Sequence, residues 1–328
     1  MPATSQDGAV QLIYVHGIGA GPRRPAMEVA WTESLARGMT RAGHGAMARR
    51  LQNAAVVEPR MVHYGPLFAR KGAQGSDDAP QAGDAPLLHA LVAELIAELS
   101  SEAADPVDRR ILAQAQAQLD PTGTPQGLGN VLRCINNAVC TLMNLRPIRG
   151  VGQWTSAKVM IKDLSQVTRY VERGEVDDAG QPLDRRIRAV FHQEVGTAPA
   201  IVVAHSLGTV VTLESLHRSA AEVPLLVTLG SPLGMRTVVL PRLRPQPPGT
   251  PDNVREWVNF WDPDDPVVAR RDLAKDVGPN ALGVSPRSHR VECPRVWTHP
   301  VANYLEQPDV ADPIAKALER LTPGAGAS

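Results

Sequence analysis

Short apolar runs alternate along the chain with segments in which apolar residues recur every three or four positions. The first run, residues 10–15, ends at the glycine-rich stretch 16–19, which is typical of a buried strand that opens into a loop. Residues 27–43 follow with apolar positions at helical spacing and a glycine at the end. A strand, a loop and a helix are therefore expected in this order.

The same alternation continues to the end of the chain. Further strands are expected within residues 55–68, 201–204, 224–230, 254–261 and near 288–293. Further helices are expected over residues 87–99, 107–119, 158–174, 183–195 and 209–222, with a closing helix near the C-terminus. Apolar strands that alternate with amphipathic helices predict an α/β fold, in which helices cover both faces of a mainly parallel sheet.

The chain is expected to form a single domain over its 328 residues. The helical block at residues 71–160 is too long for a simple crossover and is interpreted as an insertion or cap over one end of the sheet. Its polar start, residues 71–86, is expected to be an exposed, mobile loop, and residues 131–160 show a mixed pattern. Residues 323–328 are expected to be a disordered tail.

The stretch AHSLG, residues 204–208, joins a buried strand to a helix and carries a serine at its centre. A tight strand-to-helix bend needs small residues around the serine, and Ala204 and Gly208 occupy those positions, with His205 beside Ser206. The usual pattern has glycine at both ends, so Ala204 is a departure from it. We interpret Ser206 as an exposed nucleophile, and an ordinary serine-glycine turn is the alternative.

A serine nucleophile needs a base and an acid, which follow it along the chain in the order acid, base. The strand at 254–261 ends in a loop rich in aspartate, where Asp265 is the expected acid because Pro266 and Val267 then lead back into structure. Asp262, nearest the end of the strand, is the runner-up. Such a loop is also common in turns that have no catalytic role.

Three histidines follow the serine, and they differ in their expected positions. His217 is expected within a helix, and His289 at the start of the last strand. His299 is expected in the loop beyond that strand, which suits a side chain that must reach the serine. We therefore expect His299 to be the base, with a surface histidine or helix cap as the alternative.

Two backbone N–H groups are expected to form an oxyanion hole. Leu207 follows the serine at a helix N-terminus, where N–H groups are free. Ile18 lies in the loop His16, Gly17, Ile18, Gly19, whose glycines allow a close approach of the backbone. This loop could also hold a phosphate, but neither a lysine-containing phosphate loop nor a complete dinucleotide fingerprint accompanies it.

The motifs VHGIG, AHSLG, TLGSPLG, DPDDPV and WTHPVANYL, in this order, resemble those of the α/β-hydrolase superfamily. The resemblance is closest to bacterial serine esterase or lipase-like proteins and more distant to lipase-like hydrolases of the inositol-deacylase type. It covers residues 10–70 and 160–310 and is weak over 71–150. It implies an α/β-hydrolase fold with a small sheet of about six strands.

The resemblance also implies a mechanism. Ser206 would attack an acyl carbonyl, His299 would accept its proton, and Asp265 would orient His299, while the N–H groups of Ile18 and Leu207 stabilise the intermediate. The implied substrate is a small-molecule or lipid ester, with no cofactor and no metal. A non-catalytic protein that uses the same fold for binding or regulation is the alternative, and the sequence does not indicate an oligomeric state.

The composition of the chain limits the partners and the cellular location that are expected. Lysine plus arginine and aspartate plus glutamate each total 34, so the net charge is zero, which disfavours broad binding to nucleic acid. The three cysteines (Cys134, Cys140 and Cys293) are too few for a disulfide framework or a zinc site. No secretory signal begins the sequence, and the weakly apolar stretch 132–145 is interrupted by polar residues. A cytoplasmic protein without a transmembrane segment is expected.

Overall fold

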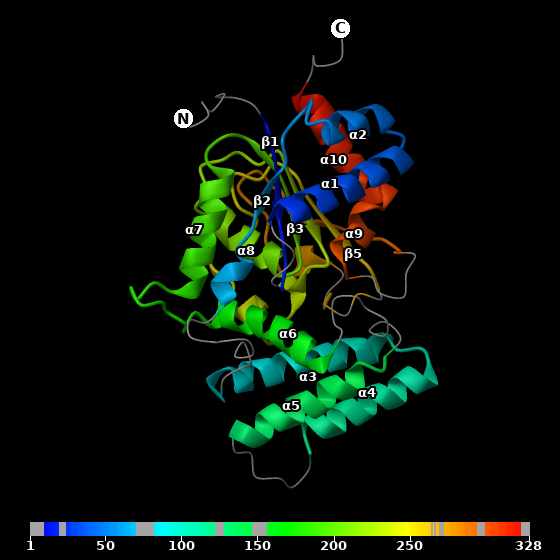
Figure 1. Ribbon diagram of the computed structural model, residues 1–328, viewed down its shortest axis with the longest axis vertical. Helices are drawn as coiled ribbons and strands as arrows, with labels where there is room; N and C mark the ends of the chain where they lie inside the picture. Colours follow the sequence, from blue (N-terminus) through cyan, green and yellow to red (C-terminus); the bar gives the residue numbers. More distant parts are fainter. Residues whose placement is uncertain are drawn as a thin grey trace.

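Figure 1 shows the computed structural model, in which a central sheet lies between two groups of helices and a further helical layer crosses one end of the sheet. The structure describes residues 10–19, 24–69, 82–121, 128–145, 156–263, 265, 267–268, 272–293 and 299–322. The expected tail at 323–328 and most of the expected loop at 71–86 lie outside these ranges.

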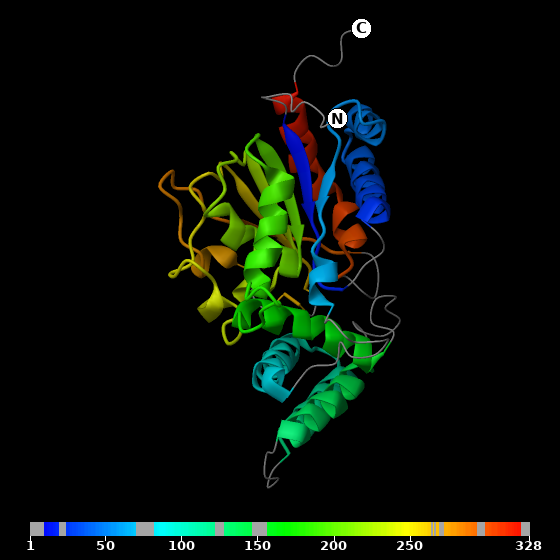
Figure 2. The ribbon, with the colours of Figure 1, turned by 60° about the vertical axis from the view of Figure 1, so that its left-hand side comes forward.

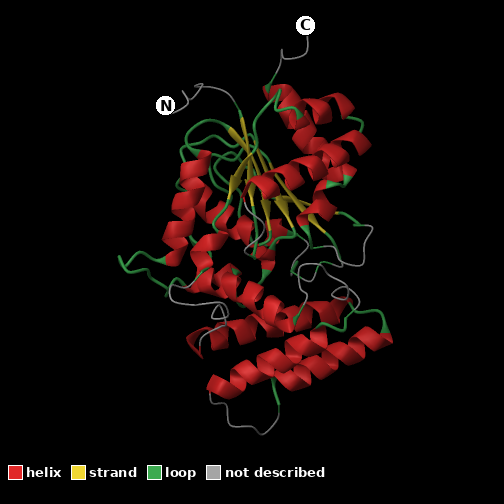
Figure 3. Ribbon diagram, in the orientation of Figure 1, coloured by secondary structure: helices red, strands yellow, loops and turns green. Residues whose placement is uncertain are grey.

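The sheet has six strands, which are all parallel and follow the order β2-β1-β3-β4-β5-β6. The strands are β1 (Gln11–Val15), β2 (Arg60–Val62), β3 (Ala200–His205), β4 (Leu225–Leu229), β5 (Trp257–Trp261) and β6 (Arg287–Arg290). In Figure 3 they form a yellow layer enclosed by helices. The expectation of an α/β fold with a parallel sheet covered by helices is thereby confirmed.

Alternation along the strands divides the apolar side chains between two cores. In β1, Leu12 and Tyr14 face one core, whereas Ile13 and Val15 face the other. The same division holds in β3, where Ile201 points with Leu12 into its core. Because successive strand residues point to opposite faces, the apolar runs that predicted the strands supply both cores at once.

Two groups of helices cover the two faces (Figures 1 and 2). The first face packs against α1 (Arg24–Arg41), α2 (Gly45–Gln52), α9 (Val301–Leu305) and α10 (Pro308–Leu321). The second face packs against α7 (Leu183–Val195) and α8 (Leu207–Leu216). In α1, the apolar residues at helical spacing that predicted the helix are the ones that face the sheet: Trp31, Leu35 and Met39 are all buried there.

Four more helices form the layer across the carboxyl ends of the strands, at the bottom of Figure 1. They are α3 (Ala85–Glu102), α4 (Pro106–Leu119), α5 (Leu128–Leu142) and α6 (Ala157–Glu172). Their apolar residues belong to the same core as α7 and α8. The helix α6 lies between the sheet domain and the other three helices and is buried on nearly every side, from Met160 to Val171.

The ends of several elements differ from the sequence expectations by two or three residues, and two stretches differ more. The helix expected over residues 209–222 begins at Leu207 and ends at Leu216, because the chain must turn before β4 and Val223 already pairs with Val254. His217 therefore caps this helix instead of lying within it. The first part of the mixed stretch, residues 131–142, belongs to α5, whose polar positions Asn136 and Cys140 lie on its exposed face, and residues 146–155 lie outside the described ranges. Among the described helices, none is both long and apolar enough to cross a membrane.

Candidate active site

Ser206 lies on a sharp turn between β3 and α8. Its backbone has φ 53° and ψ −130°, a region that residues other than glycine seldom adopt and that costs about 1–3 kcal/mol. The turn is held by its own hydrogen bonds: the Ser206 N–H donates to the Leu229 carbonyl at 3.0 Å, and the Thr209 N–H donates to the Ser206 carbonyl at 2.9 Å. The turn therefore places Ser206 at the carboxyl end of β3, directly before α8.

Two glycines allow the backbone to approach this turn. A Cβ at Gly208 would lie 2.4 Å from the His16 carbonyl oxygen, and a Cβ at Gly17 would lie 2.6 Å from the Ser206 Cβ. Both positions therefore require glycine. Ala204, the departure from the usual pattern, has its side chain fully buried in the core beneath the turn, so a methyl group is accommodated there.

The structure brings Ser206, His299 and Asp265 into one hydrogen-bonded series. His299 Nε2 lies 3.1 Å from Ser206 Oγ, and His299 Nδ1 lies 2.9 Å from each carboxylate oxygen of Asp265. All three residues are buried, so the expectation of an exposed serine is wrong: Ser206 is 1 % exposed, because the loop at residues 16–19 and the His299 segment pack against its turn. They come from three separate places: the end of β3, the loop after β5 and the segment before α9.

Asp262, the runner-up for the acid, occupies a different position. Its Oδ2 accepts a hydrogen bond from the Cys293 N–H at 2.6 Å, which ties the loop after β5 to the loop after β6. Its carbonyl also accepts the Asp265 N–H at 3.1 Å, so Asp262 shapes the turn that carries Asp265. The geometry therefore favours Asp265 as the partner of His299 and gives Asp262 a supporting position.

The Asp265 carboxylate accepts further hydrogen bonds besides the one from His299. The Tyr304 hydroxyl donates to Oδ2 at 2.7 Å, and the Val267 N–H donates to Oδ1 at 2.9 Å. Burial alone would raise the pKa of Asp265, but the electrostatic interaction with His299 and the hydrogen bonds to the carboxylate outweigh it and hold the pKa below its ordinary value. Asp265 is therefore an anion beside the imidazole.

Two residues around this carboxylate were missed by the sequence reasoning. The Tyr304 hydroxyl accepts the Asp262 N–H at 3.1 Å while it donates to Asp265, so it links both aspartates. Gly230, with φ 52°, backs the carboxylate, since a Cβ there would lie 2.7 Å from Asp265 Oδ2. Both lie within motifs already singled out, TLGSPLG and WTHPVANYL, but nothing in the sequence indicates their contacts with Asp265.

His205 supports the backbone of the candidate base. Its ring lies 4.6 Å from the His299 ring, centroid to centroid, and its Nε2 lies 2.7 Å from the His299 carbonyl oxygen. Burial, assisted by the charge of His299, lowers the pKa of His205 to about 3. The ring is therefore neutral at ordinary pH, and its Nε2–H donates to the carbonyl that fixes the His299 segment.

The loop at residues 16–19 is held in a similar way. His16 Nε2 accepts the Tyr64 N–H at 3.1 Å and the Gly65 N–H at 3.3 Å, while the Tyr64 hydroxyl donates to the His16 carbonyl at 2.6 Å. Burial, with the charge of the neighbouring His63, lowers the pKa of His16 to about 3, so the ring stays a neutral acceptor. The segment after β2 therefore anchors the start of this loop.

The two candidate oxyanion donors lie on either side of the turn. Leu207 is the first residue of α8, and Ile18 lies in the loop beside Gly17, which contacts Ser206. Neither N–H donates to an acceptor in the part of the chain that the structure describes. The next residue, Gly19, has φ 95°, and its N–H donates to Gln166 Oε1 of α6 at 3.0 Å.

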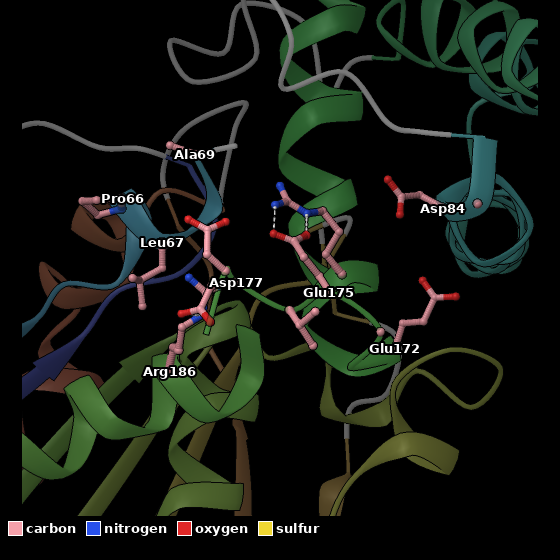
Figure 4. A pocket seen from close by; sticks show the side chains of 13 residues that line it. Pro66, Leu67, Ala69, Asp84, Glu172, Glu175, Asp177 and Arg186 are labelled. Atoms are coloured by element: carbon pink, nitrogen blue, oxygen red, sulfur yellow. Dashed lines mark hydrogen bonds and ion pairs between the residues drawn. The ribbon is translucent and has the colours of Figure 1, made fainter. Parts of the chain in front are cut away.

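A groove of about 660 Å³ lies apart from this series (Figure 4). Its centre is Arg169, which binds Glu175 through two hydrogen bonds of 2.7 and 2.8 Å and lies over the Phe68 ring at 5.3 Å. Carboxylates of Asp84, Glu172 and Asp177 surround the pair. The residues that line this groove do not include Ser206, His299 or Asp265.

The described residues contain no group of three or more histidine, cysteine, aspartate or glutamate side chains that could hold a metal ion. No protein-family model matches the chain, and searches of curated proteins and of solved structures found no match either. What the structure itself defines is the class of fold, an α/β protein with a six-stranded parallel sheet.

Proposed function

We propose that the protein is a serine hydrolase of the α/β-hydrolase type, which cleaves carboxylic esters through an acyl-enzyme. The observation that carries the proposal is the buried series of hydrogen bonds from Ser206 through His299 to Asp265, with the serine on a turn of positive φ. The order of the three residues along the chain and the resemblance of the surrounding motifs support the same assignment.

In the first half of the reaction, Ser206 Oγ attacks the carbonyl carbon of the ester as its proton passes to His299 Nε2. Asp265 accepts the hydrogen bond from Nδ1–H and stabilises the imidazolium that forms. The N–H groups of Ile18 and Leu207 stabilise the negative oxygen of the tetrahedral intermediate. When the intermediate collapses, His299 returns the proton to the leaving alkoxide, and an alcohol departs from the acyl-enzyme.

In the second half, water replaces the alcohol. His299 Nε2 takes a proton from the water as its oxygen attacks the acyl carbon. The second tetrahedral intermediate forms in the same oxyanion hole, and its collapse breaks the bond to Ser206 Oγ, which recovers the proton from His299. The carboxylic acid is released, and the enzyme returns to its starting state.

An acyl or lipid ester is the substrate class that we propose, on the basis of the resemblance and the motifs that carry it. The apolar stretch 132–145 was one candidate lining for an acyl pocket. Within it, Ile135, Val139 and Leu142 are buried in the main core. These side chains therefore stabilise the helical layer, and a chain-length preference has to be measured.

The direct test is hydrolysis of p-nitrophenyl esters of graded acyl length by the wild type and by Ser206→Ala. We expect the variant to lose at least about 10³-fold in kcat, because the nucleophile acts as a unit with its base. Ser215→Ala is a matched control, since Ser215 is also buried on α8 and its hydroxyl has no hydrogen-bond partner in the described residues. Equal rates for wild type and Ser206→Ala would contradict the proposal and favour a binding or regulatory protein.

A further inference from the structure

The helix α6 contacts the elements that carry both candidate oxyanion donors. Gln166 and Tyr170 lie four residues apart and therefore on the same face of this helix. Gln166 Oε1 accepts the Gly19 N–H at 3.0 Å, next to Ile18. The Tyr170 hydroxyl donates to Glu214 Oε2 at 2.9 Å, and Glu214 belongs to α8, the helix that begins at Leu207.

The attachment to α8 is strong and redundant. Glu214, whose side chain is 2 % exposed, also binds Arg173, the residue that caps α6. The Arg188 side chain donates to Glu214 at 3.0 Å, and the Arg244 N–H donates to it at 2.9 Å. Two of these donors, Tyr170 and Arg173, belong to α6 and its C-cap, so α6 stays attached to α8 even when one of the two is removed.

The attachment to the loop at 16–19 depends on fewer contacts. Its first residue is anchored through Tyr64, as described above, but Gly19 lies in a positive-φ conformation and its N–H is held by Gln166. The Gln166 side chain comes from a residue 147 positions away and is 2 % exposed. Because the buried Gln166 side chain accepts the Gly19 N–H, it fixes the position of the loop relative to the Ser206 turn.

We propose that Gln166 is a positioning residue of the hydrolase: it holds the loop that carries the Ile18 N–H at a fixed distance from the Leu207 N–H. This inference rests on the proposed function. Donors to an oxyanion act best when they are fixed before the reaction begins. The helix α6 thus belongs to the reaction site, although its first residues fall within the stretch 71–160 that the sequence analysis interprets as an insertion.

The test compares three variants with the wild type on one p-nitrophenyl ester. Gln166→Leu removes the acceptor, whereas Gln166→Glu retains an acceptor oxygen of the same reach. Gln118→Leu is the matched control, because Gln118 of α4 accepts a hydrogen bond from Thr141 at 2.5 Å, far along the chain from the catalytic motifs. It loses one hydrogen bond accepted by a glutamine side chain, between α4 and α5 of the helical layer.

We expect Gln166→Leu to lower kcat by about tenfold to a hundredfold and to change KM by less than about twofold, since a misplaced donor acts on the transition state. Gln166→Glu should retain kcat within about threefold, because an acceptor remains. Gln118→Leu should leave kcat within about twofold. Unchanged kcat in Gln166→Leu, or equal losses in Gln118→Leu, would overturn the inference.

A second measurement does not need activity. Hydrogen exchange at the Gly19 amide should be at least about tenfold faster in Gln166→Leu than in the wild type and unchanged in Gln118→Leu. Should Gln166→Leu fail to fold, Gln166→Asn, whose amide is too short to reach Gly19, replaces it in both measurements. A wild type without hydrolytic activity refutes the proposed function, and the catalytic role of Gln166 with it. Slow exchange at Gly19 in every folded variant refutes the positioning role by itself.

Discussion

Two regions of the molecule pair a carboxylate with a cationic or basic group, and they differ in how completely the pair is enclosed. Beside the Ser206 turn, the side chains of Asp265 and His299 are fully buried, and both residues accept hydrogen bonds from other parts of the chain. In the groove of Figure 4, Arg169 is held by Glu175, but Glu172 and Asp84 face an open space. The cavity of about 660 Å³ therefore lies beside Glu172 and Asp84, and the residues that line it do not include Ser206, His299 or Asp265.

The surroundings also shift the pKa of the carboxyl group in opposite directions in the two regions. Around Asp265, the charge of His299 and three hydrogen bonds overcome burial, so the pKa of the acid is lowered. At Glu172, partial burial and the nearby Asp84 carboxylate raise the pKa of the acid. The first arrangement stabilises a fixed negative charge, which a triad requires, whereas the second disfavours that charge. The surroundings of Asp265 thus favour its charged form, whereas those of Glu172 favour the neutral acid.

The largest effect that would sharpen this comparison is expected from Asp265→Asn. The amide cannot orient the neutral imidazole as the carboxylate does, so kcat for ester hydrolysis should fall by about 10⁴-fold. Asp262→Asn is the matched control, because an amide oxygen can still accept the Cys293 N–H. Its kcat should fall by less than about tenfold. If the two variants had the same activity, Asp265 would not be the triad acid.

A second expected effect is the loss of stability in mild acid. The folded-state pKa values of His16 and His205 are lowered from 6.5 to about 3. The unfolded chain therefore binds protons at these positions below about pH 6.5, whereas the folded chain does not do so until about pH 3. The stabilising contribution of the neutral rings is complete above pH 6.5 and is lost as the pH falls toward 3.

Denaturant unfolding between pH 7 and pH 4 tests this expectation. The free energy of unfolding should decrease as the pH is lowered, and the decrease should be shallower in His205→Asn, which has one such group fewer. A pH slope that is identical in the wild type and in His205→Asn would show that the His205 ring is not the source of the effect.

The smallest effect is expected from the groove of Figure 4. Glu172→Gln removes a carboxylate whose charged form is disfavoured by burial and by Asp84. We expect kcat for ester hydrolysis to stay within about twofold of the wild type, and stability to change by less than about 0.5 kcal/mol. If Glu172→Gln lost as much kcat as Asp265→Asn, the groove and not the Ser206 turn would be the place of the reaction.

The sequence was most informative where local pattern and chemistry agree. Strand, turn and helix around Ser206 follow from four apolar residues and two small ones. The order of serine, acid and base along the chain limited the candidates, and the expected loop positions then favoured Asp265 and His299, which the structure brings into hydrogen-bond distance. These inferences need only the common direction of the strands, because the carboxyl ends of parallel strands all lie at the same edge of the sheet.

The remaining contacts depend on distances that a sequence does not contain. Gln166 reaches Gly19 across 147 positions, and Tyr304 reaches Asp265 across 39. Each looks like an ordinary helical residue in the pattern of its own segment. The helix α5 was obscured for a different reason, since asparagines on its exposed face interrupt an apolar run without interrupting the helix. Packing partners, and not local propensity, decide these positions.

The most direct test of the central claim is covalent labelling of the wild type with a fluorophosphonate, followed by digestion and mass spectrometry. The account predicts one adduct, on the peptide that contains Ser206, which is absent in Ser206→Ala and forms far more slowly in Asp265→Asn. A folded wild type that is not labelled, or an adduct on a different serine, would contradict the claim that Ser206 is the activated nucleophile.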